Sequence, residues 1–255
     1  MAAVTITIAF ANQKGGVAKT TSVASLGVAL AEADQRVLLV DLDPQGSLTF
    51  SLGIDPEDLS DTVGEVLLGK IPATTAILHA DEGVDLLPAN ISLSAAEESL
   101  VTRTGREQRL RAALARVAED YDFILLDCPP ALGVLTVGAL SAADQVIIPL
   151  QAETLSHRGV GQLLDTIHDV RSFINDSLEI RGVLPTMFDG RTTHAQNVLA
   201  AVGETYELPV LEPIPKSIRF AEAPAIGASI LTTAKKHKGA DAYRALAATI
   251  MATAK

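Results

Sequence analysis

The chain has 255 residues, of which 48% are hydrophobic and 20% are charged, and this balance excludes an intrinsically disordered protein. Its one cysteine, Cys128, excludes an intrachain disulfide and a cysteine-based zinc site, and we expect it to be a small buried side chain. The formal net charge of −11 argues against nucleic-acid binding over the whole surface. Residues 211–255 differ from the rest, because they contain seven Lys or Arg and three Asp or Glu.

The start of the chain runs directly into the apolar stretch VTITIAFA, without the basic region or cleavage site of a signal peptide. The longest apolar stretches also fall short of the ~18 residues that a membrane-spanning helix needs. We therefore expect a cytoplasmic protein that does not associate with membranes.

Apolar segments typical of buried strands alternate with segments typical of helices. In chain order we predict a strand over 4–11, a helix over 20–33, strands over 36–43 and 84–89, a helix over 106–119, strands over 121–130 and 144–150, a helix over 157–174, a strand over 180–188, and helices over 195–206 and 240–254. Residues 53–80 are the least regular and are expected to cross the surface. The alternation predicts an α/β fold, with a mostly parallel sheet covered by helices on both faces, in a single domain over 1–255.

Residues 13–21 read QKGGVAKTT and lie between the first strand and the first helix, as a phosphate-binding loop requires. Gly15 and Gly16 allow a tight turn that directs N–H groups at an anion, and the helix N-terminus adds its positive dipole end. Lys19 is placed to reach the β- and γ-phosphates, and Thr20 to bind Mg²⁺. The alternative, a glycine turn before an ordinary helix, is disfavoured by the full set of lysines, glycines and threonines.

The loop departs from the usual G-x-x-x-x-G-K-[ST] pattern. Gln13 and Ala18 stand where that pattern has glycine, and Lys14 adds a second lysine. We expect the helix N-terminus to tolerate the methyl group of Ala18, with a small effect on nucleotide affinity.

Acidic residues end two of the predicted strands. VDLDPQG places Asp41 and Asp43 at the carboxyl end of one strand, and FILLDCPP places Asp127 at the end of another. In an open α/β sheet this edge holds the ligand. Carboxylates there can hold Mg²⁺ through water or orient an attacking water. The alternative for Asp41 and Asp43, a solvated Asp-Pro turn, is less favoured beside a phosphate-binding loop.

Four motifs follow one another along the chain: QKGGVAKTT, VDLDPQG, FILLDCPP and EPIPKSIRFAEAPAIGASI. Together they resemble the ParA family of partition ATPases, in its Soj-like branch. That family belongs to the deviant Walker A group, with the Min-system ATPase and the nitrogenase iron protein. The resemblance implies a P-loop NTPase-like domain, ATP and Mg²⁺ as cofactors, slow ATP hydrolysis, and a homodimer with two ATP molecules between its loops.

The resemblance also implies roles for individual residues. Lys14 matches a lysine that reaches the partner's ATP across the dimer, Gly15 would lie at that interface, and Asp43 matches the residue that positions the attacking water. Catalytic roles are implied for Lys14, Lys19 and Asp43. Nucleotide contacts are implied for Lys14, Gly15, Gly16, Val17, Ala18, Lys19, Thr20, Thr21, Met187 and Pro215. Metal contacts are implied for Thr20, Asp43 and Asp127.

Members of this family bind double-stranded DNA without sequence preference, and a ParB-like partner, with a basic N-terminal peptide, accelerates their hydrolysis. The resemblance therefore implies a nucleoid-associated protein that positions a chromosome, a plasmid or another cargo. Phosphate contacts of this kind need only Lys and Arg. The candidates are Arg191, Lys216, Arg219, Lys235, Lys236 and Lys238. The alternatives are a solvated charge run and, for Arg219, an ion pair with Glu222.

Three rival functions were weighed. A Min-type membrane ATPase needs a basic amphipathic C-terminal helix with large apolar residues, whereas AYRALAATIMATAK is rich in alanine and is expected to pack on the core. An iron–sulfur protein needs more than one cysteine per chain. A P-loop kinase for a small molecule gains nothing from Lys14 facing a second active site.

Overall fold

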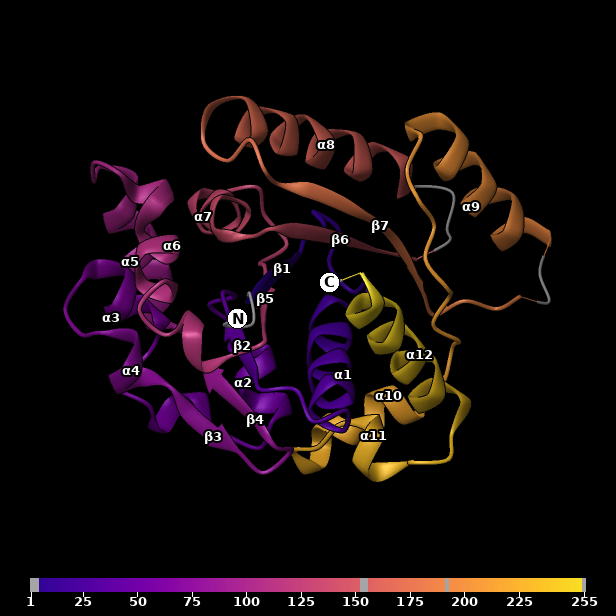
Figure 1. Ribbon diagram of the computed structural model, residues 1–255, viewed down its shortest axis with the longest axis horizontal. Coiled ribbons are helices and arrows are strands. Elements are labelled where there is room, and N and C mark those ends of the chain that lie inside the picture. Colours follow the sequence, from indigo (N-terminus) through magenta and orange to yellow (C-terminus); the bar gives the residue numbers. More distant parts are fainter. Residues whose placement is uncertain (1–4, 152–155, 191–192, 254–255) are drawn as a thin grey trace.

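The computed structural model describes residues 5–151, 156–190 and 193–253. Within these ranges, seven strands form one sheet in the order β3-β4-β2-β5-β1-β6-β7 (Figure 1). Neighbouring strands are parallel except for β3, which runs antiparallel to β4 at the edge. The prediction of an α/β fold with a mostly parallel sheet is confirmed.

The strands agree with the predicted ones to within a few residues at each end. Their bounds are β1 (Ile6–Phe10), β2 (Val37–Asp41), β3 (Leu78–Ala80), β4 (Val84–Leu87), β5 (Phe123–Asp127), β6 (Gln145–Gln151) and β7 (Glu179–Thr186). Only β3 has no predicted counterpart, because three residues are too few to show a periodic pattern.

Helices connect the strands and cover both faces of the sheet. Their bounds are α1 (Lys19–Ala31), α2 (Ser47–Ser51), α3 (Val63–Leu68), α4 (Ala73–Ala76), α5 (Ser92–Val101), α6 (Arg109–Leu114), α7 (Val134–Ala142), α8 (Ser156–Phe173), α9 (Thr193–Tyr206), α10 (Arg219–Glu222), α11 (Ile230–Thr233) and α12 (Lys238–Ala252). Short 3₁₀ turns occur at Pro56–Asp58, Arg106–Gln108, Ala118–Asp120 and Ala223–Ile226.

Two of the sequence expectations were wrong in detail. Residues 53–80 do not simply cross the surface, because α3 buries Val63, Val66 and Leu67 in the core. The helix predicted over 106–119 is divided into α6 and two flanking 3₁₀ turns. Its apolar stripe is nevertheless buried as expected, since Leu110, Leu114 and Val117 all lie in the core.

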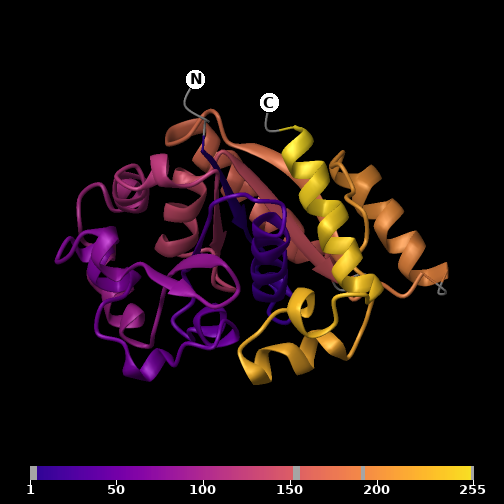
Figure 2. The ribbon, with the colours of Figure 1, turned by 60° about the horizontal axis from the view of Figure 1, so that its bottom comes forward.

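The sheet separates two hydrophobic cores, and alternate residues of each strand serve one or the other. On β5, Ile124 and Leu126 face the core beneath α3, α5, α6, α7 and α8. Phe123 and Leu125 face the core beneath α1, α2, α11 and α12. In this second layer α12 lies along α1 (Figure 2). Cys128 is buried, as expected.

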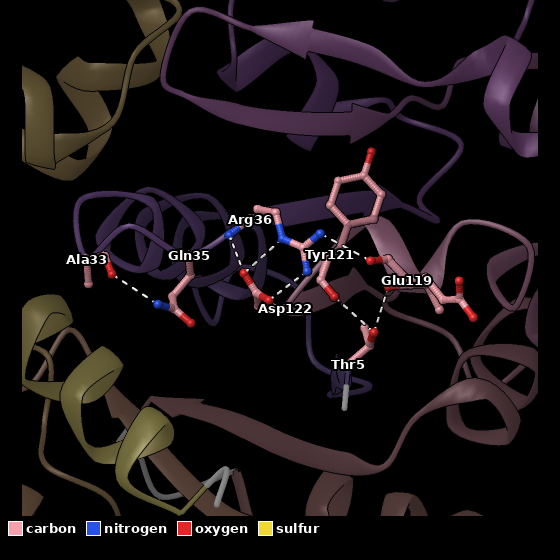
Figure 3. A network of polar contacts seen from close by, with 8 residues as sticks. Thr5, Ala33, Gln35, Arg36, Glu119, Tyr121 and Asp122 are labelled. Atoms are coloured by element: carbon pink, nitrogen blue, oxygen red, sulfur yellow. Dashed lines mark hydrogen bonds and ion pairs between the residues drawn. The ribbon is translucent and has the colours of Figure 1, made fainter. Parts of the chain in front are cut away.

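The two edges of the sheet have different tasks. At the amino edge, Arg36 binds the Asp122 carboxylate through two nitrogens, at 2.8 and 3.2 Å, and Thr5 donates to the backbone oxygens of Ala118 and Tyr121 (Figure 3). The Arg36 guanidinium lowers the pKa of Asp122. These contacts tie β1, β2 and β5 together at one end. At the other end, β2 and β5 each end in an aspartate, Asp41 and Asp127.

Candidate functional site

The loop between β1 and α1 is anchored by two side chains that the sequence analysis did not single out. The Asn12 amide donates to the Pro149 carbonyl at 2.6 Å, and its oxygen accepts from the Lys14 backbone N–H at 2.9 Å. The Thr186 hydroxyl donates to the Val17 carbonyl at 2.9 Å. These bonds attach the loop to β6 and β7.

The loop glycines are exposed and have room around them. Gly16 has a φ of +72°, which favours glycine, whereas Gly15 does not have a left-handed backbone. A Cβ at either position would meet no atom of the described residues within 4 Å. The described part of the chain therefore leaves room for a second molecule to approach Gly15.

Ala18, the residue before α1, has a φ of 61° and a ψ of 34°, which is the left-handed region. The sequence analysis expected only a tolerated methyl group at a helix N-terminus. In the structure the unfavourable feature of Ala18 is its backbone conformation, because the left-handed region costs an alanine about 1–2 kcal/mol of conformational free energy.

Replacing Ala18 with glycine should therefore stabilise the protein by about 1 kcal/mol, after allowing for the greater freedom of glycine in the unfolded chain. Urea unfolding without nucleotide measures this difference. Ala24→Gly, in the middle of α1, is the matched control and should destabilise by a similar amount. Equal stability of Ala18→Gly and the wild type would contradict the backbone explanation.

Lys19, Thr20 and Thr21 line a pocket of about 600 Å³. Lys19 opens α1 and is 7% exposed, and Thr20 and Thr21 follow it on the same helix turn. The predicted residues that line this nucleotide-sized pocket are Gly15, Gly16, Ala18, Lys19, Thr20, Thr21, Asp43 and Met187. Val17 is buried beneath the loop, and Lys14 is half-buried beside it. Lys14, Asp127 and Pro215 are not among the lining residues.

The pocket wall also includes residues that the sequence analysis missed. Phe50 from α2, Pro130 after β5 and Phe220 from α10 line it. Hydrophobic periodicity identifies buried positions, so it could not identify these residues as part of a pocket wall, and only the three-dimensional structure does. Phe50 is 56% exposed, which is unusual for a large apolar side chain in a single chain.

Asp41 and Asp43 have different environments, although the sequence analysis gave them one shared task. Asp41 is fully buried and accepts from the Thr49 N–H and hydroxyl, at 2.9 and 2.8 Å, and from the Asp43 N–H at 3.1 Å. Burial raises its pKa to about 6. Asp43 lines the pocket instead, with one oxygen accepting from the Gln45 N–H. The Asp41 oxygens hold α2 and the Asp43 backbone in place, so of the two acids it is Asp43 that lines the pocket.

Asp127 is buried in register with Asp41 on the neighbouring strand. Within the described part of the chain, neither of its carboxylate oxygens has a hydrogen-bond partner. Burial and the Asp41 carboxylate raise its pKa to about 8, against the lowering influence of the Thr20 hydroxyl, which lies nearby without meeting hydrogen-bond geometry, and of the Lys19 charge. A buried carboxylate without partners is costly unless a cation or its water ligands satisfy it. The residues present therefore fit a Mg²⁺ ion at this end of β5.

The raised pKa of Asp127 gives a prediction for the protein without Mg²⁺ or nucleotide. The unfolded carboxyl has a pKa near ~4, so between about pH 4 and pH 8 the folded state binds more protons than the unfolded state. Stability should therefore fall as pH rises through this window. In Asp127→Asn this fall should be smaller than in the wild type. Urea unfolding between pH 5 and pH 8 tests it, and parallel curves for the two proteins would contradict it.

A smaller, mostly apolar recess of about 280 Å³ shares Ala18, Thr21, Met187 and Phe220 with the nucleotide-sized pocket. Met187 has a φ of 49°, and Ile214 lies in the recess wall. Pro215, predicted as a nucleotide contact, pairs its backbone with Phe188 instead of lining the recess.

Behind the recess, aromatic residues join α1 to the C-terminal region. Phe220 meets Tyr243 edge to face, with ring centroids 5.9 Å apart. The Tyr243 hydroxyl bonds Ser22 of α1 at 3.0 Å.

The candidate DNA-binding cations lie mainly on one side of the molecule. Lys216, Lys235, Lys236 and Lys238 are exposed around α10, α11 and the start of α12 (Figure 1). Arg219 forms an ion pair with Glu222 at 2.9 Å, so the alternative considered for it is confirmed. Arg191 lies outside the described residues.

Helix α12 packs on the core, as the sequence analysis expected. Tyr243, Leu246, Ala247 and Ile250 are buried against the layer that contains α1. None of the helices in the described ranges combines the length and apolar character needed to cross a membrane.

Comparison with known families and curated proteins gives consistent matches. A family model described as an AAA domain (AAA_31) matches residues 5–180. The sporulation initiation inhibitor protein Soj of Bacillus subtilis is 42% identical over 96% of this chain and 98% of its own length. The chromosome partitioning protein ParA of Caulobacter vibrioides is 42% identical over 94% of this chain and 91% of its own length.

Solved structures with the same fold carry nucleotides. A Mycobacterium smegmatis structure named cobyrinic acid a,c-diamide synthase, with an ATP analogue and magnesium, is 53% identical, with a TM-score of 0.88 over 97% of this chain and 95% of that one. A variant of Cyanothece McdA with ATP is 25% identical, with a TM-score of 0.88 over 98% and 97%. The Pyrococcus horikoshii septum site-determining protein MinD with Mg-ADP is 27% identical, with a TM-score of 0.77 over 98% of each chain.

Proposed function

Because the chain belongs to the Soj/ParA family of P-loop ATPases, we propose that it is a single-domain partition ATPase that dimerises with ATP, binds DNA in that state and hydrolyses ATP slowly. The proposal rests on a phosphate-binding loop whose Lys19, Thr20 and Thr21 line a nucleotide-sized pocket together with Asp43, while Lys14 is half-buried beside that pocket. Homologous structures contain ADP or an ATP analogue with magnesium, so ATP and Mg²⁺ are its cofactors.

The phosphates of ATP would lie against the loop and the start of α1. Gly15, Gly16 and Val17 supply backbone N–H groups, and the left-handed Ala18 turns the chain into the helix, where Thr21 lines the pocket. Lys19 balances the β- and γ-phosphates from a nearly buried position. We place the adenine in the apolar recess beside Met187, with Phe220 as a second wall, and Pro215 contributes through the backbone that frames it.

Thr20, Asp43 and Asp127 would hold Mg²⁺, directly or through its water ligands. Bound Mg²⁺ supplies positive charge that offsets the charge on the transferring phosphate. The residues of this chain supply the rest of the chemistry. Thr20 presents its hydroxyl at the pocket, and Asp127 contributes the buried charge behind it.

Asp43 would orient the attacking water. Its carboxylate lies at the carboxyl end of β2 and lines the pocket, so it can accept a proton or hydrogen bond from water beside the γ-phosphate. Asp41 fixes the Asp43 backbone from below through a 3.1 Å bond, which makes Asp41 a positioning residue. We expect the protein alone to hydrolyse ATP slowly, because a partner molecule is required to complete this arrangement.

Lys14 would act across a dimer. ATP carries about four negative charges, and two ATP molecules face to face repel each other unless cations lie between them. A lysine on each exposed loop, next to a glycine with open space around it, meets that requirement. Dimerisation then depends on the γ-phosphate, and ATP hydrolysis releases the two chains.

DNA binding would follow from the same dimer. Lys216, Lys235, Lys236 and Lys238 project from one side of each chain, and dimerisation doubles their number on one assembly. Arg219 contributes less, because Glu222 neutralises it. Arg191 remains a candidate. A ParB-like activator would accelerate hydrolysis, and the cargo is a chromosome, a plasmid or another large assembly in the cytoplasm.

A Min-type membrane ATPase is the second candidate, favoured by the likeness to MinD. Its membrane contact would need an exposed apolar helix face, whereas α12 buries its apolar side chains on α1. Binding to vesicles that contain anionic lipid, only with ATP, would favour this candidate over the partition ATPase.

The name of the Mycobacterium smegmatis structure suggests a third activity, ATP-dependent amide formation. If glutamine supplied the nitrogen, a reactive thiolate would be needed. Cys128 does not fit that role, because it is buried and burial raises its pKa. Incubation with cobyrinic acid, ammonium and ATP would reveal this activity as ADP formation that requires cobyrinic acid.

Co-sedimentation with random-sequence duplex DNA tests the proposed function. The protein is mixed with DNA in Mg-ATP, in Mg-ADP and without nucleotide, at two salt concentrations. We expect binding only with Mg-ATP, with a steep loss at high salt because the contacts are to phosphates. Binding that is equal in all three states would contradict the nucleotide switch, and no binding in any state would contradict the DNA contact.

A further inference from the structure

A second pocket of about 500 Å³ lies between α3, α4 and α6 and shares no residue with the nucleotide-sized pocket. Val66, Leu67, Ile71 and Ala113 form an apolar wall. Helices α3 and α6 lie across the sheet from α10 and α12 (Figures 1 and 2). We refer to this second pocket as the α3–α6 pocket.

The lining of the α3–α6 pocket is positively charged. Lys70, Arg109 and Arg116 line it, and none of its described lining residues is acidic. The surrounding sequence is also basic, because residues 103–116 contain five arginines and one acid, Glu107. This concentration of positive charge stands out in a chain with a net charge of −11. The function proposed for the nucleotide site does not involve the α3–α6 pocket.

The three cations are only partly used within the chain. The Lys70 ammonium lies 3.9 Å from Glu65, at the outer limit of an ion pair, and is 60% exposed. Among the described residues, Arg116 has no ion pair and is exposed.

Arg109 is held more rigidly. One of its terminal nitrogens donates to the Leu67 carbonyl at the end of α3, while its buried Nε has no hydrogen-bond partner in the described ranges. That Nε is covered by the chain, so a carboxylate in the pocket would pair with the terminal nitrogens of the guanidinium, whose planar array of N–H groups suits a carboxylate.

We propose that the α3–α6 pocket docks an acidic segment of a partner protein, with its carboxylates on Lys70, Arg109 and Arg116 and an apolar side chain against Ile71 and Ala113. This surface goes beyond the proposed function and does not depend on it. Charge complementarity selects the acidic character of the partner. The apolar wall selects a side chain with hydrocarbon to bury, which a phosphate backbone lacks. The expected ParB-like activator has a basic peptide, so the occupant is a different protein.

The test uses the full chain and a fluorescein-labelled peptide of Asp and Glu residues around a central pair of leucines. Fluorescence anisotropy at low salt measures its affinity. The variant Lys70→Glu/Arg116→Glu reverses two exposed charges and leaves Arg109, which also caps α3, in place. Arg171→Glu, an exposed arginine on α8, is the matched control. ATP hydrolysis of both variants should equal that of the wild type and reports correct folding.

We expect the double variant to bind the peptide about tenfold more weakly, with no change for Arg171→Glu. Replacing the leucines of the peptide with serine should also weaken binding to the wild type. Equal peptide binding by all three proteins would overturn the proposal. So would a double variant that loses DNA binding but not peptide binding. Loss of a nucleotide-independent self-association, seen by sedimentation of the wild type, would instead assign the pocket to a second copy of this chain.

Discussion

Replacing Asp43 with alanine should reduce ATP hydrolysis by at least about 100-fold while ATP binding persists. The reason is geometric, since Asp43 lines the pocket and, within the described ranges, its carboxylate supports the fold through the Gln45 N–H alone. Loss of the water-orienting group leaves Lys19, Thr20 and the loop N–H groups to hold the nucleotide. The dimer should accumulate with Mg-ATP, because release requires hydrolysis. Steady-state phosphate release and size-exclusion chromatography with Mg-ATP measure the two effects.

Glu57→Ala is the matched control, because Glu57 is an exposed acid in the neighbouring segment that does not line the pocket. Its hydrolysis rate should equal that of the wild type. A monomeric Asp43→Ala protein at saturating ATP, or one that hydrolyses ATP at the wild-type rate, would contradict the role given to Asp43. Asp41→Ala should differ from both, because removing a buried carboxylate with three hydrogen bonds should destabilise the fold itself.

Replacing Lys14 with alanine should abolish ATP-dependent dimerisation while the monomer still folds and binds ATP. Lys14 does not line the pocket of its own chain, whereas Lys19 does. Removing one partner of a buried charge pair costs about 2–5 kcal/mol, so the dimer dissociation constant should rise at least ~30-fold. Binding of a fluorescent ATP analogue and size-exclusion chromatography separate the two properties.

Lys70→Ala, a change at an exposed lysine outside the nucleotide-sized pocket, is the control and should dimerise like the wild type. If Lys14→Ala dimerised with unchanged affinity, the cross-subunit role would be wrong. Loss of nucleotide binding together with dimerisation would also contradict it, because that result would place Lys14 at the phosphates of its own chain.

Much of the fold could be predicted from the sequence because the central strands are continuous apolar runs. RVLLVDLD and YDFILLDCPP could be assigned as buried strands without knowledge of their neighbours, and both proved to be adjacent in the sheet. The pieces between residues 47 and 80 could not be predicted in this way. Their helices have four to six residues, too few for a period of 3.6 to emerge, and packing defines them instead, with α3 on α5 and α2 on α1 and β2.

The phosphate-binding loop could be located from the sequence, because its glycines, lysines and threonines lie close together at a fixed spacing along the chain. The parts that support it could not. Asn12 and Thr186 hold the loop through bonds to residues that are 137 and 169 positions away. Asp41 and Asp43 are two residues apart and chemically identical, yet only the structure separates a buried support from a pocket-lining group.

The central claim is that ATP, and not ADP, joins two chains. Sedimentation velocity of the wild-type protein without nucleotide, with Mg-ADP and with Mg-ATP, recorded soon after mixing, tests it most directly. We expect a monomer in the first two conditions and a dimer with Mg-ATP, with return to the monomer as ATP is consumed. A protein that stays monomeric with Mg-ATP, or that is equally dimeric in all three conditions, would contradict it.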